Sequence, residues 1–195
     1  MRLQGTTIGV AMAGSLCNMK KSFEAVKGLV AEGADVIPVL SENARQDSRF
    51  GKGEDWIRLA REITGHEPLL SITEVEPFGP KKLLDCLVVL PCTGNTVAKL
   101  ANAITDTGVT MAAKAHLRNG RPVVLAVTTN DGLGLNAKNI GILLAARNIF
   151  FVPFGQDNPV EKPNSIDARL EFLIPTILRA LEGKQLQPLL MGPSQ

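Results

Sequence analysis

The chain alternates between short apolar runs and longer segments whose apolar residues recur at helical spacing. The runs are typical of buried strands, and they lie at 7–12, 35–40, 69–72, 87–90, 122–128 and 149–153. The longer segments place apolar residues three and four positions apart, and they lie at 18–32, 54–64, 77–84, 97–104, 109–119, 136–147 and 166–182. Strands separated by helices predict an α/β fold. We expect a three-layer, Rossmann-like or flavodoxin-like parallel sheet with helices on both faces.

The length of the chain and the glycines along it indicate how many domains it forms and where its helices end. The 195 residues fit one domain, which we place at residues 1–183. Gly33, Gly65 and Gly120 follow predicted helix ends, where glycine commonly stops a helix. Residues 184–195 are expected to form an extended or disordered C-terminal tail.

Four loops that follow predicted strands carry unusually many small and hydrogen-bonding residues. They are Gly14-Ser15, Ser41, 92–96 and 128–134. Right-handed crossovers would bring these loops to one edge of the sheet, where α/β proteins bind ligands. The pattern therefore predicts one shared site.

The segment 92–96 has the layout of a phosphate cradle, because a predicted strand precedes it and a predicted helix follows it. A helix that begins there points free N–H groups and a partial positive charge at the site. Capping the helix needs only one hydroxyl. The candidate cofactor-binding residues are Gly14, Ser15, Ser41, Thr93, Gly94, Asn95 and Thr96.

Each of the other strand-end loops also has an ordinary structural explanation. Gly14-Ser15 is equally a turn with a serine cap, and Ser41 is equally an N-cap. In the last loop, Asn130 offers both donors and an acceptor, which makes it the candidate substrate-binding residue. The neighbouring Asp131 precedes a glycine and is expected to be structural.

Charge and composition exclude several classes of function. The net charge of +2, without a long basic run, favours neither nucleic acid nor an anionic membrane as a partner. The apolar runs are too short to span a bilayer. The first strand with its glycines is unlike an export signal, so we expect a cytoplasmic protein.

The cysteines and histidines of the sequence do not identify a catalytic residue. Three widely spaced cysteines argue against a disulfide framework or a metal site. For Cys17 and Cys92, inert packing is favoured over a thiol activated by a helix N-terminus. Neither His66 nor His116 follows a predicted strand, so Ser-His-Asp chemistry has no support.

The segment Pro91–Thr96, followed by 98–101 and Asp106, resembles the signature loop of the FMN-binding flavoprotein family. That family includes phosphopantothenoylcysteine decarboxylase, peptidyl-cysteine decarboxylases and flavin prenyltransferase. The resemblance covers about residues 5–182 and places Ser41 and Asn130 in other cofactor or substrate loops. It implies bound FMN and a homo-oligomer. With no tyrosine and one tryptophan, the flavin would rest on backbone, aliphatic or neighbouring-subunit contacts.

Three longer runs resemble one branch of this family: TGNTVAKLANAITD, MAAKAHLRNGRPVVLAVTTNDGLGLNAKNIG and ITEVEPFGPKKLLD. The branch implies an oxidoreductase subunit of sporulating bacteria. It would act with a separate A subunit on a small dicarboxylate, with NAD(P) as hydride acceptor. Lys20 and Lys21 are either attractors of that dicarboxylate or a solvated helix face.

Two departures from the family pattern keep other functions open. Cysteine decarboxylases of the family place a histidine about eight residues before the aspartate that corresponds to Asp85, and this chain has none between His66 and Asp85. The run VTTNDGLG keeps only Asn130 of the family's second motif. The alternatives are a non-catalytic accessory subunit with a vestigial pocket, or an FMN-dependent decarboxylase or prenyltransferase.

Overall fold

The computed structural model describes residues 1–192 of the chain. Its centre is one sheet in the order β2-β1-β3-β4-β7-β6, with β5 paired to β4. β1 to β5 are parallel, and β7 runs antiparallel to both β4 and β6. The strands are β1 (Thr7–Met12), β2 (Asp35–Leu40), β3 (Cys86–Cys92), β4 (Val123–Thr129), β5 (Ile149–Phe151), β6 (Phe154–Gly155) and β7 (Ile166–Ala168).

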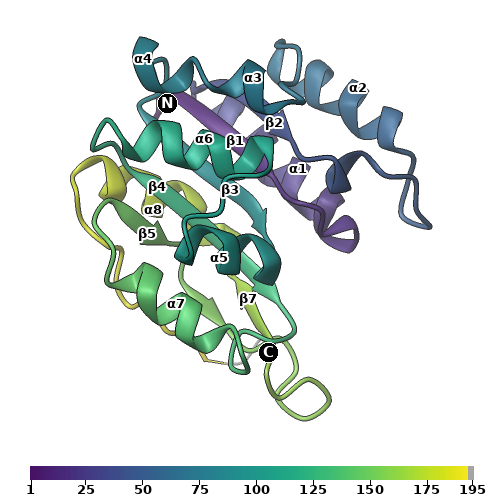
Figure 1. Cartoon of the computed structure of the whole chain (residues 1–195), viewed down its shortest axis with the longest axis vertical. Helices are drawn as coiled ribbons and strands as arrows, with labels where there is room; N and C mark the ends of the chain where they lie inside the picture. The colour runs from purple at the N-terminus through teal and green to yellow at the C-terminus, as the bar shows by residue number, and fades with distance from the viewer. Residues whose placement is uncertain (193–195) are drawn as a thin grey trace.

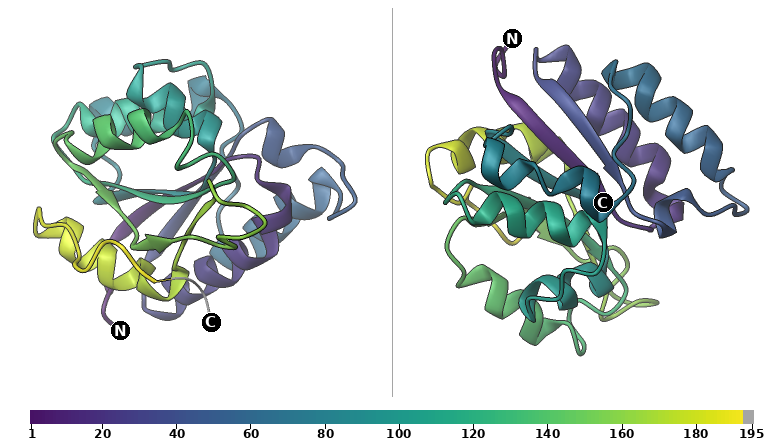
Figure 2. Two further views of the ribbon diagram at one scale, coloured as in Figure 1. Left: turned by 90° about the horizontal axis from the view of Figure 1, so that it is seen from below. Right: turned by 45° about the horizontal axis from the view of Figure 1, so that its top comes forward.

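Helices cover both faces of this sheet, as the left view of Figure 2 shows. One face carries α1 (Met19–Ala31), α2 (Gly53–Thr64) and α8 (Leu173–Leu181). The other carries α3 (Ile72–Val75), α4 (Phe78–Lys81), α5 (Gly94–Ala101), α6 (Gly108–Leu117) and α7 (Ala137–Leu144). Short 3₁₀ turns lie at Leu16–Asn18, Asn43–Arg45 and Leu170–Phe172. The predicted α/β fold class is confirmed.

The central strands supply side chains to both cores. In β3, Cys86 and Val88 pack into the core beneath α1 and α8, whereas Leu87 and Val89 pack into the core beneath α6. Successive strand residues point to opposite faces, so a strand buried on both sides is apolar throughout. This explains the continuous apolar run in the sequence.

The expected helix over residues 166–182 is wrong in its first half. Ile166–Ala168 form β7, and α8 begins only at Leu173. β7 pairs with Thr128 and Thr129 at the end of β4. Pairing with a distant strand overrides the local spacing of apolar residues here, which sequence periodicity does not reveal.

Two strands predicted from the sequence have different bounds in the structure. In place of a strand at residues 69–72, only Leu69 forms a single bridge, to Val39. β3 continues through Pro91 to Cys92, with a register shift between Val89 and Cys92; a bulge is one place where a strand tolerates proline. α5 accordingly begins at Gly94, three residues before position 97, where the apolar repeat predicted its start.

The segment after Gly183 returns to the sheet. The side chain of Gln185 accepts a hydrogen bond from the backbone N–H of Phe151 at 2.8 Å and donates one to its carbonyl at 2.7 Å. Leu190 then bridges to Phe154. The last part of the expected tail, 193–195, lies outside the described residues. Within the described part of the chain, no helix has the length and apolarity that a membrane crossing requires.

Candidate functional site

The carboxyl ends of β1, β2, β3 and β4 meet at one edge of the sheet, where the polar loops of the sequence converge (Figure 1). The candidate residues divide between two hollows along this edge. The first, which we name the cradle cavity, is lined by Gly14, Ser41, Thr93, Asn95 and Thr96. The second, which we name the Asn130 cavity, is lined by Ser15 and Asn130.

The cradle cavity has a volume of about 40 Å³. One water needs roughly 10–15 Å³ by this kind of measure, so the space suits one compact group such as a phosphate. The helix α5 opens at this cavity. Thr93 is its N-cap, and its Oγ1 accepts a hydrogen bond from the Thr96 N–H at 3.2 Å. The first amides of α5 have no partner inside the helix and carry its positive dipole end.

Ser41 contributes a buried hydroxyl to the same cavity. Its Oγ accepts a hydrogen bond from the Ala44 N–H at 3.2 Å, so Ser41 does cap the short turn after β2. A capping hydroxyl that accepts one bond still has a proton to donate. The capping and ligand-binding explanations of Ser41 are therefore compatible.

The two candidate glycines differ in what they do. A Cβ on Gly14 would lie 2.4 Å from the Cβ of Asn43, so glycine lets the β1 loop approach the β2 loop. A Cβ on Gly94 would lie 2.6 Å from Thr129 Oγ1 and 2.7 Å from Asp131 Oδ1. Gly94 lines neither cavity. Because Gly94 has no side chain, α5 can pack closely against the loop that follows β4.

Lys99 is a functional candidate that our sequence reasoning did not select. It lines the cradle cavity from α5, and its Nζ lies 2.8 Å and 2.9 Å from the two carboxylate oxygens of Asp106. The hydrogen bond and charge of Lys99 lower the pKa of Asp106. Lys99 follows Asn95 by four residues, which puts both on one face of a helix. That spacing was the available signal.

The Asn130 cavity is larger, about 230 Å³. Ser15, predicted as a cofactor residue, lies here, and its Oγ accepts a hydrogen bond from Asn18 Nδ2 at 2.9 Å. Asn130 is exposed, and within residues 1–192 its side chain makes no hydrogen bond. Its amide is thus available to a ligand in this cavity.

The charged groups around the Asn130 cavity are paired. Lys162 lines the cavity and binds Asp157 at 2.9 Å, which raises the pKa of Lys162. Asp167 of β7 receives a hydrogen bond from Thr128 Oγ1 at 2.7 Å and an ion pair from Lys21 at 3.0 Å. Lys21 is thereby drawn toward the cavity rim.

The loop that follows β4 is held by Asp131. Thr129 Oγ1 donates to one carboxylate oxygen at 2.5 Å, and Asn136 Nδ2 donates to the other at 2.7 Å. Asn139 in turn donates to Asn136 at 2.8 Å. Asp131 thus has the structural role that the Asp-Gly turn indicates, and it fixes the loop that presents Asn130.

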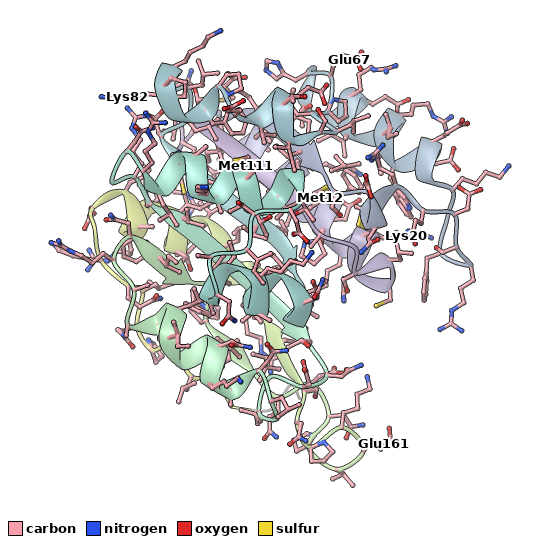
Figure 3. The ribbon with its side chains drawn as sticks, viewed as in Figure 1. Met12, Lys20, Glu67, Lys82, Met111 and Glu161 are labelled. Carbon is pink, nitrogen blue, oxygen red and sulfur yellow. The ribbon has the colours of Figure 1, made fainter. Side chains whose placement is uncertain are left out.

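The remaining candidates lie away from these cavities or are exposed. Lys20 is exposed on the first turn of α1 (Figure 3). His66 binds Asp35 at 2.7 Å, at the opposite end of β2. Burial raises the pKa of Cys92, which is inert packing as expected. The same expectation is wrong for Cys17, which is exposed and lines the Asn130 cavity.

A family model described as "Flavoprotein" matches residues 2–169. The chain belongs to the flavoprotein family. This flavoprotein is 50% identical over 190 residues to the B subunit of dipicolinate synthase from Bacillus subtilis (strain 168), and the match covers 97% of this chain and 95% of that protein. Within the family, it is therefore of the type of the dipicolinate synthase B chain.

Solved structures agree with this assignment. The crystal structure of the B subunit of dipicolinate synthase from Bacillus halodurans C matches this flavoprotein with a TM-score of 0.92, at 46% identity and with 100% of both chains covered. The crystal structure of AnUbiX in complex with FMN and dimethylallyl pyrophosphate matches with a TM-score of 0.62. It is 16% identical and covers 76% of this chain and 77% of its own, so it supports the fold alone.

Proposed function

We propose that this chain is the flavoprotein subunit of dipicolinate synthase. Together with a separate A subunit, it would oxidise dihydrodipicolinate to dipicolinate in the mother-cell cytoplasm of a sporulating bacterium. The observation that supports this most is the cradle cavity. It is phosphate-sized, lies at a helix N-terminus and has the Lys99 ammonium in its wall, in a chain that is half identical to a dipicolinate synthase component.

The residues around the cradle cavity fit the phosphate of FMN. The first turn of α5, the Ser41 hydroxyl and Lys99 would hold that phosphate, since amides, hydroxyls and ammonium groups all bind it favourably. Ser15, in the adjoining Asn130 cavity, would contact the ribityl chain. Bound FMN would supply hydride acceptance, with NAD(P) as the final acceptor in the complex.

The chain's own contribution would be the orientation of a dicarboxylate substrate. Asn130 has a free amide in a cavity of about 230 Å³, and an amide N–H group can donate to a carboxylate. Lys162 lines the same cavity and is paired with Asp157, and Lys21 is paired with Asp167, which also lines it. These groups would hold the ring in place while its aromatisation removes a hydride and a proton.

A second candidate is a non-catalytic accessory subunit that positions the A subunit. It is favoured by the absence of an imidazole from both cavities within the described residues. The lack of a histidine between His66 and Asp85 argues against a cysteine decarboxylase, whose family histidine would lie near Pro77. Both candidate functions require a complex with the A subunit.

We also propose a homo-oligomer. Leu133 and Leu135, in the loop before α7, and Ile142 on α7 are 50%, 85% and 51% exposed. Three large apolar side chains left exposed within ten positions of the chain favour an interface. Light scattering of the purified chain measures its oligomeric state directly, and a monomer would contradict this expectation.

Absorbance spectroscopy and reconstitution test the proposal. We expect the purified chain to bind FMN, and the mixture with the A subunit to form dipicolinate faster than the A subunit alone. A chain that stays colourless after incubation with FMN would refute the flavin assignment. Asn95→Ala and Asn130→Ala separate the two candidates, because full activity of both variants with intact assembly favours the accessory subunit. Glu54→Gln, on the distant α2, is the control.

A further inference from the structure

A third hollow adjoins the cradle cavity on its β2 side, and we name it the Glu42 cavity. Its volume is about 300 Å³, the lower end of the range for small-molecule sites. Its walls come from the loop that follows β2, from the first turn of α3 with the two residues before it, and from the N-terminal start of α6. The lining residues used below are Glu42, Leu70, Ile72, Thr73, Asp106 and Thr107.

Three links make the Glu42 cavity continuous with the cradle cavity. Ser41 lines the cradle, and the next residue, Glu42, lines the neighbouring hollow. Thr107 lines both. Lys99 of the cradle binds Asp106 of the Glu42 cavity at 2.8 Å. A phosphate in the cradle would therefore have the Asn130 cavity on one side and the Glu42 cavity on the other.

The walls of the Glu42 cavity suit a nucleoside. Leu70 and Ile72 offer half-buried apolar surface against which a flat base can pack. Glu42 is exposed, and within residues 1–192 its carboxylate takes part in no hydrogen bond or ion pair. In dinucleotide-binding α/β folds, an acidic residue beyond the glycine turn accepts hydrogen bonds from ribose hydroxyls. Glu42, directly after the second strand, is placed for this.

We propose that the Glu42 cavity binds the adenosine half of a dinucleotide whose phosphate lies in the cradle cavity, with Glu42 accepting hydrogen bonds from the ribose hydroxyls. The inference rests on the phosphate cradle of the proposed function. FAD and NAD⁺ share this adenosine half. NADP⁺ carries an additional phosphate on the same ribose, and the Glu42 carboxylate repels it. The chain therefore prefers FAD to FMN, or NAD⁺ to NADP⁺.

Calorimetric titration of the full chain with FMN, FAD, NAD⁺ and NADP⁺ tests this. We expect FAD to bind about tenfold more tightly than FMN, or NAD⁺ about tenfold more tightly than NADP⁺, the size of effect that one hydrogen bond to a charged group confers. Glu42→Gln should reduce that preference, because its amide oxygen accepts hydrogen bonds without the negative charge, and should leave FMN affinity unchanged. Thr73→Trp, which fills the cavity, should do the same. Glu76→Gln is the matched control, an exposed carboxylate outside the cavity.

The outcomes separate this inference from the proposed function. Equal affinity for FMN and FAD, together with no preference for NAD⁺, overturns the adenosine subsite while the FMN assignment stands. A preference that is undiminished in both Glu42→Gln and Thr73→Trp also overturns it. Conversely, NAD⁺ binding that depends on Glu42, in a chain that binds neither flavin, supports the subsite and refutes the FMN assignment.

Discussion

Lys99 and Asp106 form an ion pair, with the Nζ 2.8 Å from Oδ1, on the wall between the cradle cavity and the Glu42 cavity. The Lys99 side chain is only 21% exposed, whereas that of Asp106 is 55% exposed. The ammonium is thus held over the cradle by a partner that faces solvent. An anion such as a phosphate in the cradle cavity would therefore lie beside the Lys99 ammonium, whose position Asp106 already fixes.

Replacement of Lys99 should weaken phosphate binding. We expect Lys99→Met to lower the affinity for FMN or inorganic phosphate about tenfold, because a charge-assisted bond contributes roughly 1.5–3 kcal/mol. Asp106→Asn should retain or increase that affinity, since it leaves Lys99 unneutralised. Titration followed by flavin fluorescence measures both. Lys114→Met, which changes an exposed side chain on α6, is the control; equal losses in both lysine variants would contradict the assignment.

Gly94 should tolerate no side chain. In Gly94→Ala, the new Cβ would meet Thr129 Oγ1 at 2.6 Å and push α5 away from the loop that holds Asp131. We expect a loss of roughly 1–3 kcal/mol in the free energy of unfolding, as for other overpacked sites. Urea denaturation measures it. Gly141→Ala is the matched control, because a Cβ there meets nothing within 4 Å and alanine favours a helix by about 0.5–1 kcal/mol.

His116 should make the fold sensitive to acid. It is fully buried on α6, where its imidazole contacts the backbone of Pro122. Burial lowers its pKa from 6.5 to about 4. Between about pH 6.5 and pH 4, His116 is protonated in the unfolded chain but neutral in the native chain. The free energy of unfolding therefore falls as the pH drops through this range.

The comparison of wild type with His116→Leu isolates this effect. The stability difference between the two should grow in favour of the variant by up to about 3 kcal/mol between pH 7 and pH 4. Denaturation curves across that range measure it. A constant difference between wild type and His116→Leu would show that His116 does not titrate with folding.

Gln185 should stabilise the last parallel strand. Its amide makes two hydrogen bonds to the backbone of Phe151 in β5. Gln185→Ala should lower the free energy of unfolding by about 2 kcal/mol, at roughly 1 kcal/mol for each bond. Gln187→Ala, in the same segment but exposed and, among the described residues, hydrogen-bonded to Leu189 alone, is the control. Thermal denaturation of both variants checks the difference.

The sequence predicted the parts of this fold that local patterns encode. The apolar runs of β1, β3 and β4 are continuous because both faces of these strands are buried, and the polar loops after them converge through the topology of a parallel sheet. Thr93 and Ser41 could therefore be assigned to the right edge from their positions after predicted strands. Their exact partners depended on where α5 begins, which the register shift near Pro91 altered.

The rest depended on contacts between distant segments. β7 forms by pairing with Thr128 and Thr129 at the end of β4 and with β6, and no local pattern contains those pairings. The Glu42 cavity needs Ser71 and Thr107 to lie across from one another, although 36 positions separate them. The ion pair of Lys99 with Asp106 likewise depends on the turn between α5 and α6.

The single bridge formed by Leu69 also covers the outer edge of β2. Leu69 donates to the carbonyl of Pro38 and accepts from the N–H of Leu40, on the outer side of β2. Pro38 itself has no N–H to offer. Exposed strand edges recruit foreign strands and seed aggregates, and proteins commonly block them with proline or a covering loop. A proline and one crossing residue thus close the outermost edge of this sheet against strand addition by other molecules.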